Sequence, residues 1–104
     1  METPLTGIIK NVELIEIIEL NLQFIYGTVE HDNLGRWKLN DWMVSSAIER
    51  IDTQNLLVYT RNSIYKIDAL SSPVLLSAEQ FLLVRQGISP SYILGQVHEE
   101  FQSS

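Results

Sequence analysis

Cysteine is absent from this sequence of 104 residues, and proline, glycine and cationic residues are few. Without cysteine the chain has neither a disulfide nor a thiolate metal site, which fits a reducing compartment such as the cytosol. The longest apolar runs have four residues, at Leu56–Tyr59 and Phe81–Val84, whereas a membrane-spanning helix needs about 20. The first residues lack the basic and apolar regions of a signal peptide. We therefore expect a soluble, cytoplasmic protein with no membrane partner.

Positive charge is also scarce, since 7 Lys and Arg residues face 13 Asp and Glu residues and the net charge is −6. A protein that binds phosphate backbones needs a basic face, so nucleic-acid binding is not expected. The acidic balance leaves three interpretations open: an ordinary solvated surface, mimicry of nucleic acid, and attraction to a basic partner.

Catalytic patterns are missing as well. The glycines are isolated, so no phosphate-binding loop is present. His31 and His98 have no carboxylate, serine or cysteine at a spacing that specifies a triad, and His98 with Glu99 or Glu100 makes a poor metal site because adjacent helical residues diverge. We expect no catalytic residue, no metal, no cofactor and no enzymatic activity.

The chain length predicts a single domain spanning residues 1–104, without repeats or linkers. A domain of this size buries only about 60–65% of the surface that its unfolded chain exposes. Self-association covers leftover apolar area in such proteins, so we expect a homodimer or higher homo-oligomer.

The first two thirds of the chain, about residues 6–70, read as β-sheet. Residues 6–20 are rich in Ile, Leu and Val and predict two short strands, although Glu13, Glu16 and Glu19 recur at a spacing that also suits one helix face. Residues 20–26 alternate as a strand, and residues 31–35 have the composition of a turn.

A further strand, straight or kinked, is predicted at residues 42–51. A turn is predicted at residues 52–55. The runs at 56–60 and 63–67 are β-type, and Arg61-Asn62 between them forms a two-residue hairpin loop. These segments predict an antiparallel meander from about residue 20 to 68.

Two short helices are predicted after the sheet. Ser77 and Gln80 match a capping box, and Gly87 stands where helices end, which gives a helix at about 77–87. Ser89-Pro90 is a cap followed by proline at the first helical position, which gives a second helix at about 89–102. Strands followed by helices define the fold class as α+β.

Aromatic, guanidinium and amide side chains recur near the predicted loops. Aromatic rings stack on bases, arginine pairs with phosphate, and asparagine reads base edges. The group includes the segments 35–37, 40–42 and 58–67. The candidate ligand-binding residues are Arg36, Trp37, Arg61, Asn62, Tyr65 and Arg85.

Four of these candidates, Trp37, Arg61, Asn62 and Arg85, also have a purely structural interpretation. Trp37 and Trp42 can plug the sheet, and Arg61-Asn62 can simply form a hairpin. Arg85 is a cation close to a helix C-terminus, a favourable position that requires no ligand.

The glycine-marked turn Gly35-Arg36-Trp37, the small-hydroxyl pair Ser45-Ser46 and the hairpin Thr60-Arg61-Asn62-Ser63-Ile64-Tyr65 resemble a pattern in small proteins of bacteriophages and other mobile elements. Among these, a sheet with two C-terminal helices is similar to the Thoeris anti-defence sponge proteins. The resemblance implies a phage-type protein that sequesters a cyclic ADP-ribose-like immune signal in the bacterial cytoplasm without cleaving it. It further implies that Arg85 contacts phosphate and that Asn62 with an aromatic residue holds the base, between paired subunits.

Two other functions remain open. An acidic inhibitor of a host defence protein, acting by direct contact, requires the carboxylates of Glu13, Glu16, Glu19, Glu30 and Asp32 to form one continuous patch. A structural or assembly module requires an exposed apolar patch without a pocket.

Overall fold

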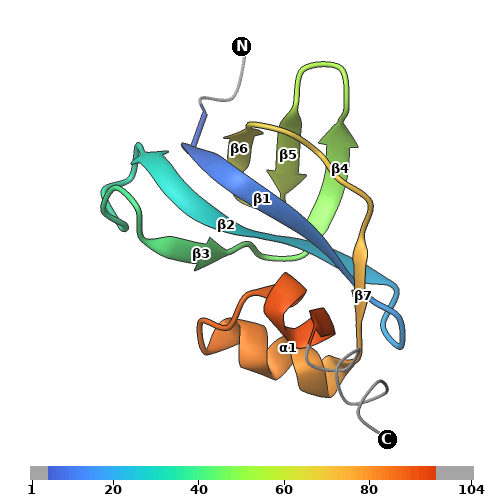
Figure 1. Ribbon diagram of the computed structural model, residues 1–104. Helices are drawn as coiled ribbons and strands as arrows, with labels where there is room; N and C mark the ends of the chain where they lie inside the picture. Colours follow the sequence, from blue (N-terminus) through green and yellow to red (C-terminus); the bar gives the residue numbers. More distant parts are fainter. Residues whose placement is uncertain (1–4, 96–104) are drawn as a thin grey trace, which may run out of the picture.

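The computed structural model describes residues 5–95, which form a sheet of seven strands with helices packed against one part of it (Figure 1). This arrangement confirms the predicted α+β class, in which strands precede helices. The elements are β1 (Gly7–Ile17), β2 (Leu22–Asp32), β3 (Trp42–Val44), β4 (Ile48–Asp52), β5 (Leu57–Thr60), β6 (Ile64–Ile67), β7 (Val74–Leu76) and α1 (Ala78–Arg85). Residues 90–95 are also helical.

The strand order is β3-β2-β1-β6-β5-β4, and β7 pairs with β1. Antiparallel pairing dominates, as predicted, but parallel pairing of β1 with both β6 and β7 interrupts the meander. The sheet therefore consists of two antiparallel units, β1-β2-β3 and β4-β5-β6, joined side by side through β1 and β6. This order places β3 at an edge of the sheet.

β1 is a single strand of 11 residues, so the prediction of two short strands is wrong. The break in its pattern is a β-bulge between Lys10 and Glu13, where Asn11 has a φ of 54°. A bulge shifts the in–out alternation of a strand by one residue. Ile9 and Leu14 consequently enter the same core in spite of their odd and even positions.

The predicted strand at 42–51 is in fact two strands, β3 and β4, separated at Ser45. The Ser45 amide donates to the carbonyl of Ile25 at 2.9 Å, and its hydroxyl accepts from the Ile25 amide at 3.0 Å. Because the hydroxyl takes the place of a backbone acceptor, the chain leaves β2 at this residue. β2 itself extends beyond the predicted 20–26, since His31 and Asp32 still pair with Ile8 and Gly7.

The local turns follow the sequence more closely. Asp52 accepts from the amides of Gln54 and Asn55 at 3.1 Å and forms the predicted turn. The hairpin with Arg61-Asn62 at its tip is confirmed, and the Thr60 amide donates to the carbonyl of Ser63 at 2.9 Å.

Two hydrophobic cores lie on opposite faces of the β1–β2 ribbon. The first fills the space enclosed by the two antiparallel units and contains Ile9, Leu14, Ile25, Val29, Met43, Val58, Tyr65 and Ile67. The second lies beneath the helices and contains Ile15, Ile17, Phe24, Leu76, Phe81, Val84 and Ile93. The adjacent residues Leu14 and Ile15 are both buried because the end of β1 is covered on both faces.

The first helix has the predicted capping box, in which Ser77 Oγ accepts from the Gln80 amide and Gln80 Oε1 accepts from the Ser77 amide. Gly87 follows the helix with a φ of 105°. The second helix is described only over residues 90–95, and the remainder of its predicted range lies outside the described residues. Neither helical segment within residues 5–95 is long and apolar enough to cross a membrane.

Candidate functional site

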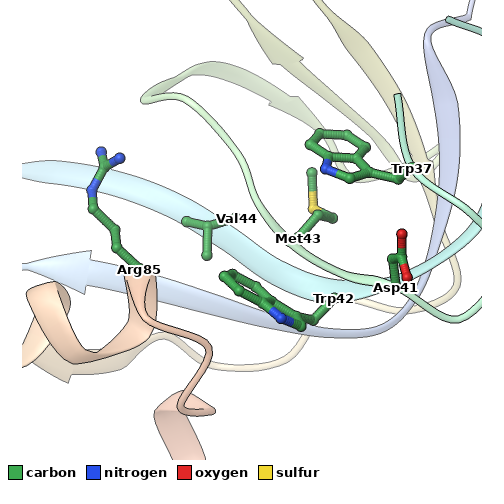
Figure 2. A pocket seen from close by; sticks show the side chains of 6 residues that line it. All are labelled: Trp37, Asp41, Trp42, Met43, Val44 and Arg85. Carbon is green, nitrogen blue, oxygen red and sulfur yellow. The ribbon is translucent and has the colours of Figure 1, made fainter. Parts of the chain in front are cut away.

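A cleft of about 500 Å³ lies beside β3, and we call it the β3-edge cleft. It brings together the loop before β3, the strand itself and the end of α1 (Figure 2). Two of the predicted ligand residues, Trp37 and Arg85, line it, and both tryptophans of the chain contribute. The lining residues are Trp37, Asp41, Trp42, Met43, Val44 and Arg85.

The position of the cleft follows from the alternation of side chains in β3. Met43 points into the first core, whereas its neighbour Val44 packs against the second. Neighbouring residues of a strand point to opposite faces, yet both line the cleft. The cleft therefore lies at the edge of β3 that faces away from β2, and it reaches both faces of the sheet.

Trp42 forms one wall of the cleft, and Tyr26 and Gly87 lie against its ring. The Tyr26 ring stacks against it with centroids 6.3 Å apart and planes inclined by 21°. The position of a Cβ on Gly87 would be only 3.3 Å from the indole, so the missing side chain makes room for the ring. Tyr26 Oη also donates to the Gly87 carbonyl at 3.4 Å, and burial, together with the nearby Glu13 carboxylate, raises the Tyr26 pKa. Trp42 nevertheless keeps 45% of its surface exposed.

Trp37 is half-buried and is supported by two other predicted site residues. The Arg36 guanidinium lies 4.2 Å from the centre of the Trp37 ring, which is the geometry of a cation–π contact. Arg36 Nη2 also donates to Tyr65 Oη at 3.3 Å, and Tyr65 is buried in the first core. The structure thus brings Arg36, Trp37 and Tyr65 together, but only Trp37 lines the cleft.

The loop that carries Trp37 is organised by Asp32. This carboxylate accepts from the backbone amides of Leu34, Arg36 and Trp37, and it pairs with Arg36 Nε at 3.5 Å. Burial opposes ionisation of the carboxyl, but these hydrogen bonds outweigh it and hold the Asp32 pKa below its ordinary value. The predicted turn therefore has a definite role, which is to fix the backbone before Trp37.

Charged side chains of opposite sign mark the two ends of the cleft. Arg85 is exposed at the end of α1 and lies over the Phe81 ring at 5.0 Å. Asp41 stands at the other end, where its Oδ2 accepts from the Lys38 amide at 2.9 Å (Figure 2). Arg85 is thus both a cation at a helix C-terminus and a lining residue, so its two interpretations are compatible.

Arg61 and Asn62 do not join this site. Both are exposed at the tip of the β5–β6 hairpin, and neither lines the cleft. Their prediction rested on the recurrence of aromatic, guanidinium and amide groups in the segment 58–67, and the aromatic Tyr65 of that segment is buried in the first core. Their structural interpretation as a hairpin loop accounts for their position.

The prediction omitted Asp41, Trp42, Met43 and Val44 from the site. Asn40-Asp41-Trp42 belonged to the aromatic and polar segments noted in the sequence, but nothing local indicated that β3 lies at an edge. An edge position depends on the pairing of the other strands, which the sequence pattern does not display.

The acidic residues of β1 and of the turn that follows it have internal partners. Glu13 accepts from the Ser91 amide and Glu19 from the Ala78 amide, each at 2.9 Å, so both carboxylates bind the first turn of a helical segment. Glu16 accepts from Gln23, its neighbour across the strand pair. Glu13 and Glu16 point to opposite faces of β1 because they are an odd number of residues apart. This distribution does not favour the single acidic patch that a protein decoy requires.

Metal binding finds no support in the described part of the chain. Within residues 5–95, no group of three or more His, Asp or Glu side chains is placed to hold an ion. His31 is exposed near the end of β2, and His98 lies outside the described residues.

Comparison with known proteins gave no match to a protein-family model, a curated protein or a solved structure. The resemblance to anti-defence sponge proteins therefore stays a prediction.

Proposed function

We propose that this protein binds and sequesters a nucleotide-like small molecule in the β3-edge cleft without altering it chemically. The observation that carries the proposal is the convergence of Trp37, Trp42 and Arg85 from separate segments on one cavity. The resemblance noted in the sequence makes cyclic ADP-ribose-like signals the first ligands to test and an anti-defence role in the bacterial cytoplasm the first biological setting.

The size and chemistry of the cleft suit such a ligand. Its volume of about 500 Å³ lies within the range of about 300–1,000 Å³ that is common for small-molecule sites. Stacking of a base on an aromatic side chain contributes about 1–3 kcal/mol. Arg85 supplies a guanidinium, whose planar fork of donors matches a phosphate.

Binding without turnover is the second part of the proposal. General acid–base catalysis of bond cleavage requires proton-transferring groups within hydrogen-bond reach of the reacting atoms. Asp41 is the one carboxylate among the lining residues, and it already accepts from the Lys38 amide. A bound ligand is therefore expected to be recovered intact.

Self-association is the third part. The outer side of α1 exposes Leu82 and Leu83, which have 59% and 39% of their surface accessible. A domain this small gains stability by covering such residues, and we propose a homodimer or higher homo-oligomer that does so.

Isothermal titration of the full chain with cyclic ADP-ribose isomers and cyclic oligonucleotides tests the binding. We expect at least one ligand to bind with a micromolar or lower dissociation constant. Arg85→Gln should weaken that binding at least tenfold, on the order of one charge-assisted hydrogen bond. Trp42→Ala should weaken it by a similar factor because a stacking surface is lost.

Arg50→Gln is the matched control, since Arg50 is exposed on β4, outside the cleft lining, and the change in charge is the same. Its affinity should stay within twofold of the wild type. Mass spectrometry of the ligand released by heating should show an unchanged mass. Failure of the whole panel to bind, or recovery of a cleaved product, would contradict the proposal.

A further inference from the structure

The backbone of β3 presents hydrogen-bonding groups to the cleft. In an antiparallel pair, residues alternate between those bonded to the partner strand and those whose N–H and C=O point away from it. The Ser45 amide donates to the backbone carbonyl of Ile25 at 2.9 Å, and the Val29 amide donates to the backbone carbonyl of Asp41 at 2.7 Å. These two bonds show which residues of the segment are bonded to β2. Trp42 and Val44, opposite Thr28 and Tyr26, therefore turn their N–H and C=O groups away from β2.

The cleft occupies the same place as these groups. Within residues 5–95, β3 pairs with β2 alone, so its other edge is open. The lining side chains come from both faces of β3, which puts the hollow in the position that a further strand would take. Figure 2 shows Trp37 and Trp42 on either side of Met43, and Trp37 packs against the first core whereas Trp42 stacks on Tyr26 beside the second, so one indole lies toward each face of the sheet.

We propose that this edge reads the hydrogen-bonding edge of a purine base, which lies beside β3 in the plane of the sheet, with Trp37 toward one face and Trp42 toward the other. The inference rests on the proposed function and specifies its ligand class. The N–H and C=O of a single β residue form an adjacent donor and acceptor, and adenine offers the complementary pair in its ring nitrogen and exocyclic amino group. Val44 is the residue whose outward N–H serves as the donor.

The charges at the ends of the cleft set the direction of the ligand. Arg85 attracts the phosphate, and the Asp41 carboxylate repels a second anion while accepting hydrogen bonds from base or sugar donors. A nucleotide with its phosphate near Arg85 satisfies both ends, whereas the reverse orientation places phosphate beside a carboxylate.

An extended peptide is a poorer occupant of the same edge. Addition of a peptide strand derives its affinity from a row of main-chain hydrogen bonds. β3 has only three residues, and only Trp42 and Val44 among them turn their backbone N–H and C=O groups away from β2. A short edge between two aromatic walls matches the area and flatness of a base better than it matches a strand.

Ligand analogues test the inference on the unmodified protein. AMP and purine riboside monophosphate share the phosphate, the sugar and the stacking surface, but the second lacks the exocyclic amino donor. Isothermal titration should show that AMP binds about tenfold more tightly, as expected for one hydrogen bond. Equal affinities for the two nucleotides would overturn base reading by this edge.

A backbone variant tests the protein side. Proline removes an N–H, and it is tolerated on edge strands where that N–H is not part of the ladder. Val44→Ala shortens the same lining side chain but keeps the N–H, so it is the reference, and Val44→Pro should bind AMP about tenfold more weakly than Val44→Ala. Circular dichroism and thermal unfolding show whether Val44→Pro folds. If it folds and binds AMP as tightly as Val44→Ala does, the assignment is overturned.

Heteronuclear NMR of the wild-type chain serves if Val44→Pro does not fold. Saturation with AMP should move the Val44 amide proton downfield, because it gains an acceptor. The inference is overturned if AMP leaves the Val44 amide unshifted. It is also overturned if an acetylated and amidated valine–threonine pentapeptide shifts this amide and AMP does not. If no nucleotide binds at all, the proposed function fails; if nucleotides bind with equal affinity and an unshifted Val44 amide, only the base-reading inference fails.

Discussion

At the scale of single residues, polar and glycine positions hold the two aromatic walls in place. Asp32 gathers three backbone amides and so fixes the loop before Trp37. Gly87 leaves space for Trp42 while ending α1 in the left-handed region. Neither residue lines the cleft, yet each determines where a lining ring can lie.

Asp32→Asn should lower the free energy of unfolding at pH 7 by about 1–2 kcal/mol, because the amide is a weaker acceptor for the loop. The folded-state pKa of Asp32 lies below its unfolded value, so its contribution is present above about pH 4 and is lost as the pH falls through the folded pKa. Urea unfolding between pH 7 and pH 3 should therefore show the difference from wild type shrinking at low pH. Glu30→Gln makes an equal charge change at an exposed position of β2, and its free energy of unfolding should differ less from wild type at pH 7. If the difference between Asp32→Asn and wild type keeps the same size down to pH 3, the role of Asp32 is contradicted.

Gly87→Ala should destabilise the protein by about 1–2 kcal/mol, because a side chain at a φ of 105° is strained. The added Cβ would also press on Trp42 at 3.3 Å, so the tryptophan fluorescence maximum should shift. Gly95→Ala is the control, since a Cβ there has no atom within 4 Å in the described structure. Equal thermal midpoints for the two variants would show that Gly87 has no special role.

At the scale of elements, local chemistry allowed prediction of the turns and helices, but not of the long-range strand order. The Ser77 capping box and the Arg61-Asn62 hairpin are complete within a few residues, so the sequence displays them. The β1 bulge belongs to the pairing of β1 with β2, and the parallel pairing of β1 with β6 joins residues 58 positions apart in the chain, such as Gly7 and Tyr65. The same long-range pairing makes β3 an edge, which explains why Trp37 and Arg85 were predicted and Asp41, Trp42, Met43 and Val44 were missed.

Glu13 connects an element of the sheet to the second helical segment. Glu13→Ala should lower the free energy of unfolding by about 1 kcal/mol, because the Ser91 amide loses its acceptor. Hydrogen exchange at residues 90–95 should accelerate more than exchange in β5 and β6. Glu13→Gln keeps an acceptor and should preserve most of the stability; uniform acceleration across the chain in Glu13→Ala would contradict a local docking role.

At the scale of the whole molecule, the helices that cover one core also expose apolar surface. Sedimentation equilibrium should give a mass at least twice the 11.9 kDa of the chain at micromolar concentration. Leu82→Lys should weaken the association about tenfold by placing a charge on the outer side of α1. Leu39→Lys, at a comparably exposed leucine of the β2–β3 loop, should have little effect. A monomer at every concentration tested would remove self-association from the proposal.

The two tryptophans give the whole molecule a built-in report on its cleft, since the chain has no others and both line the cavity. Heteronuclear NMR can follow their two indole N–H resonances during titration with a cyclic ADP-ribose isomer or AMP. Binding in the cleft should move both resonances in a saturable manner with a single dissociation constant. A ligand that saturates the protein while both indole resonances stay in place would show that the cleft is not the binding site.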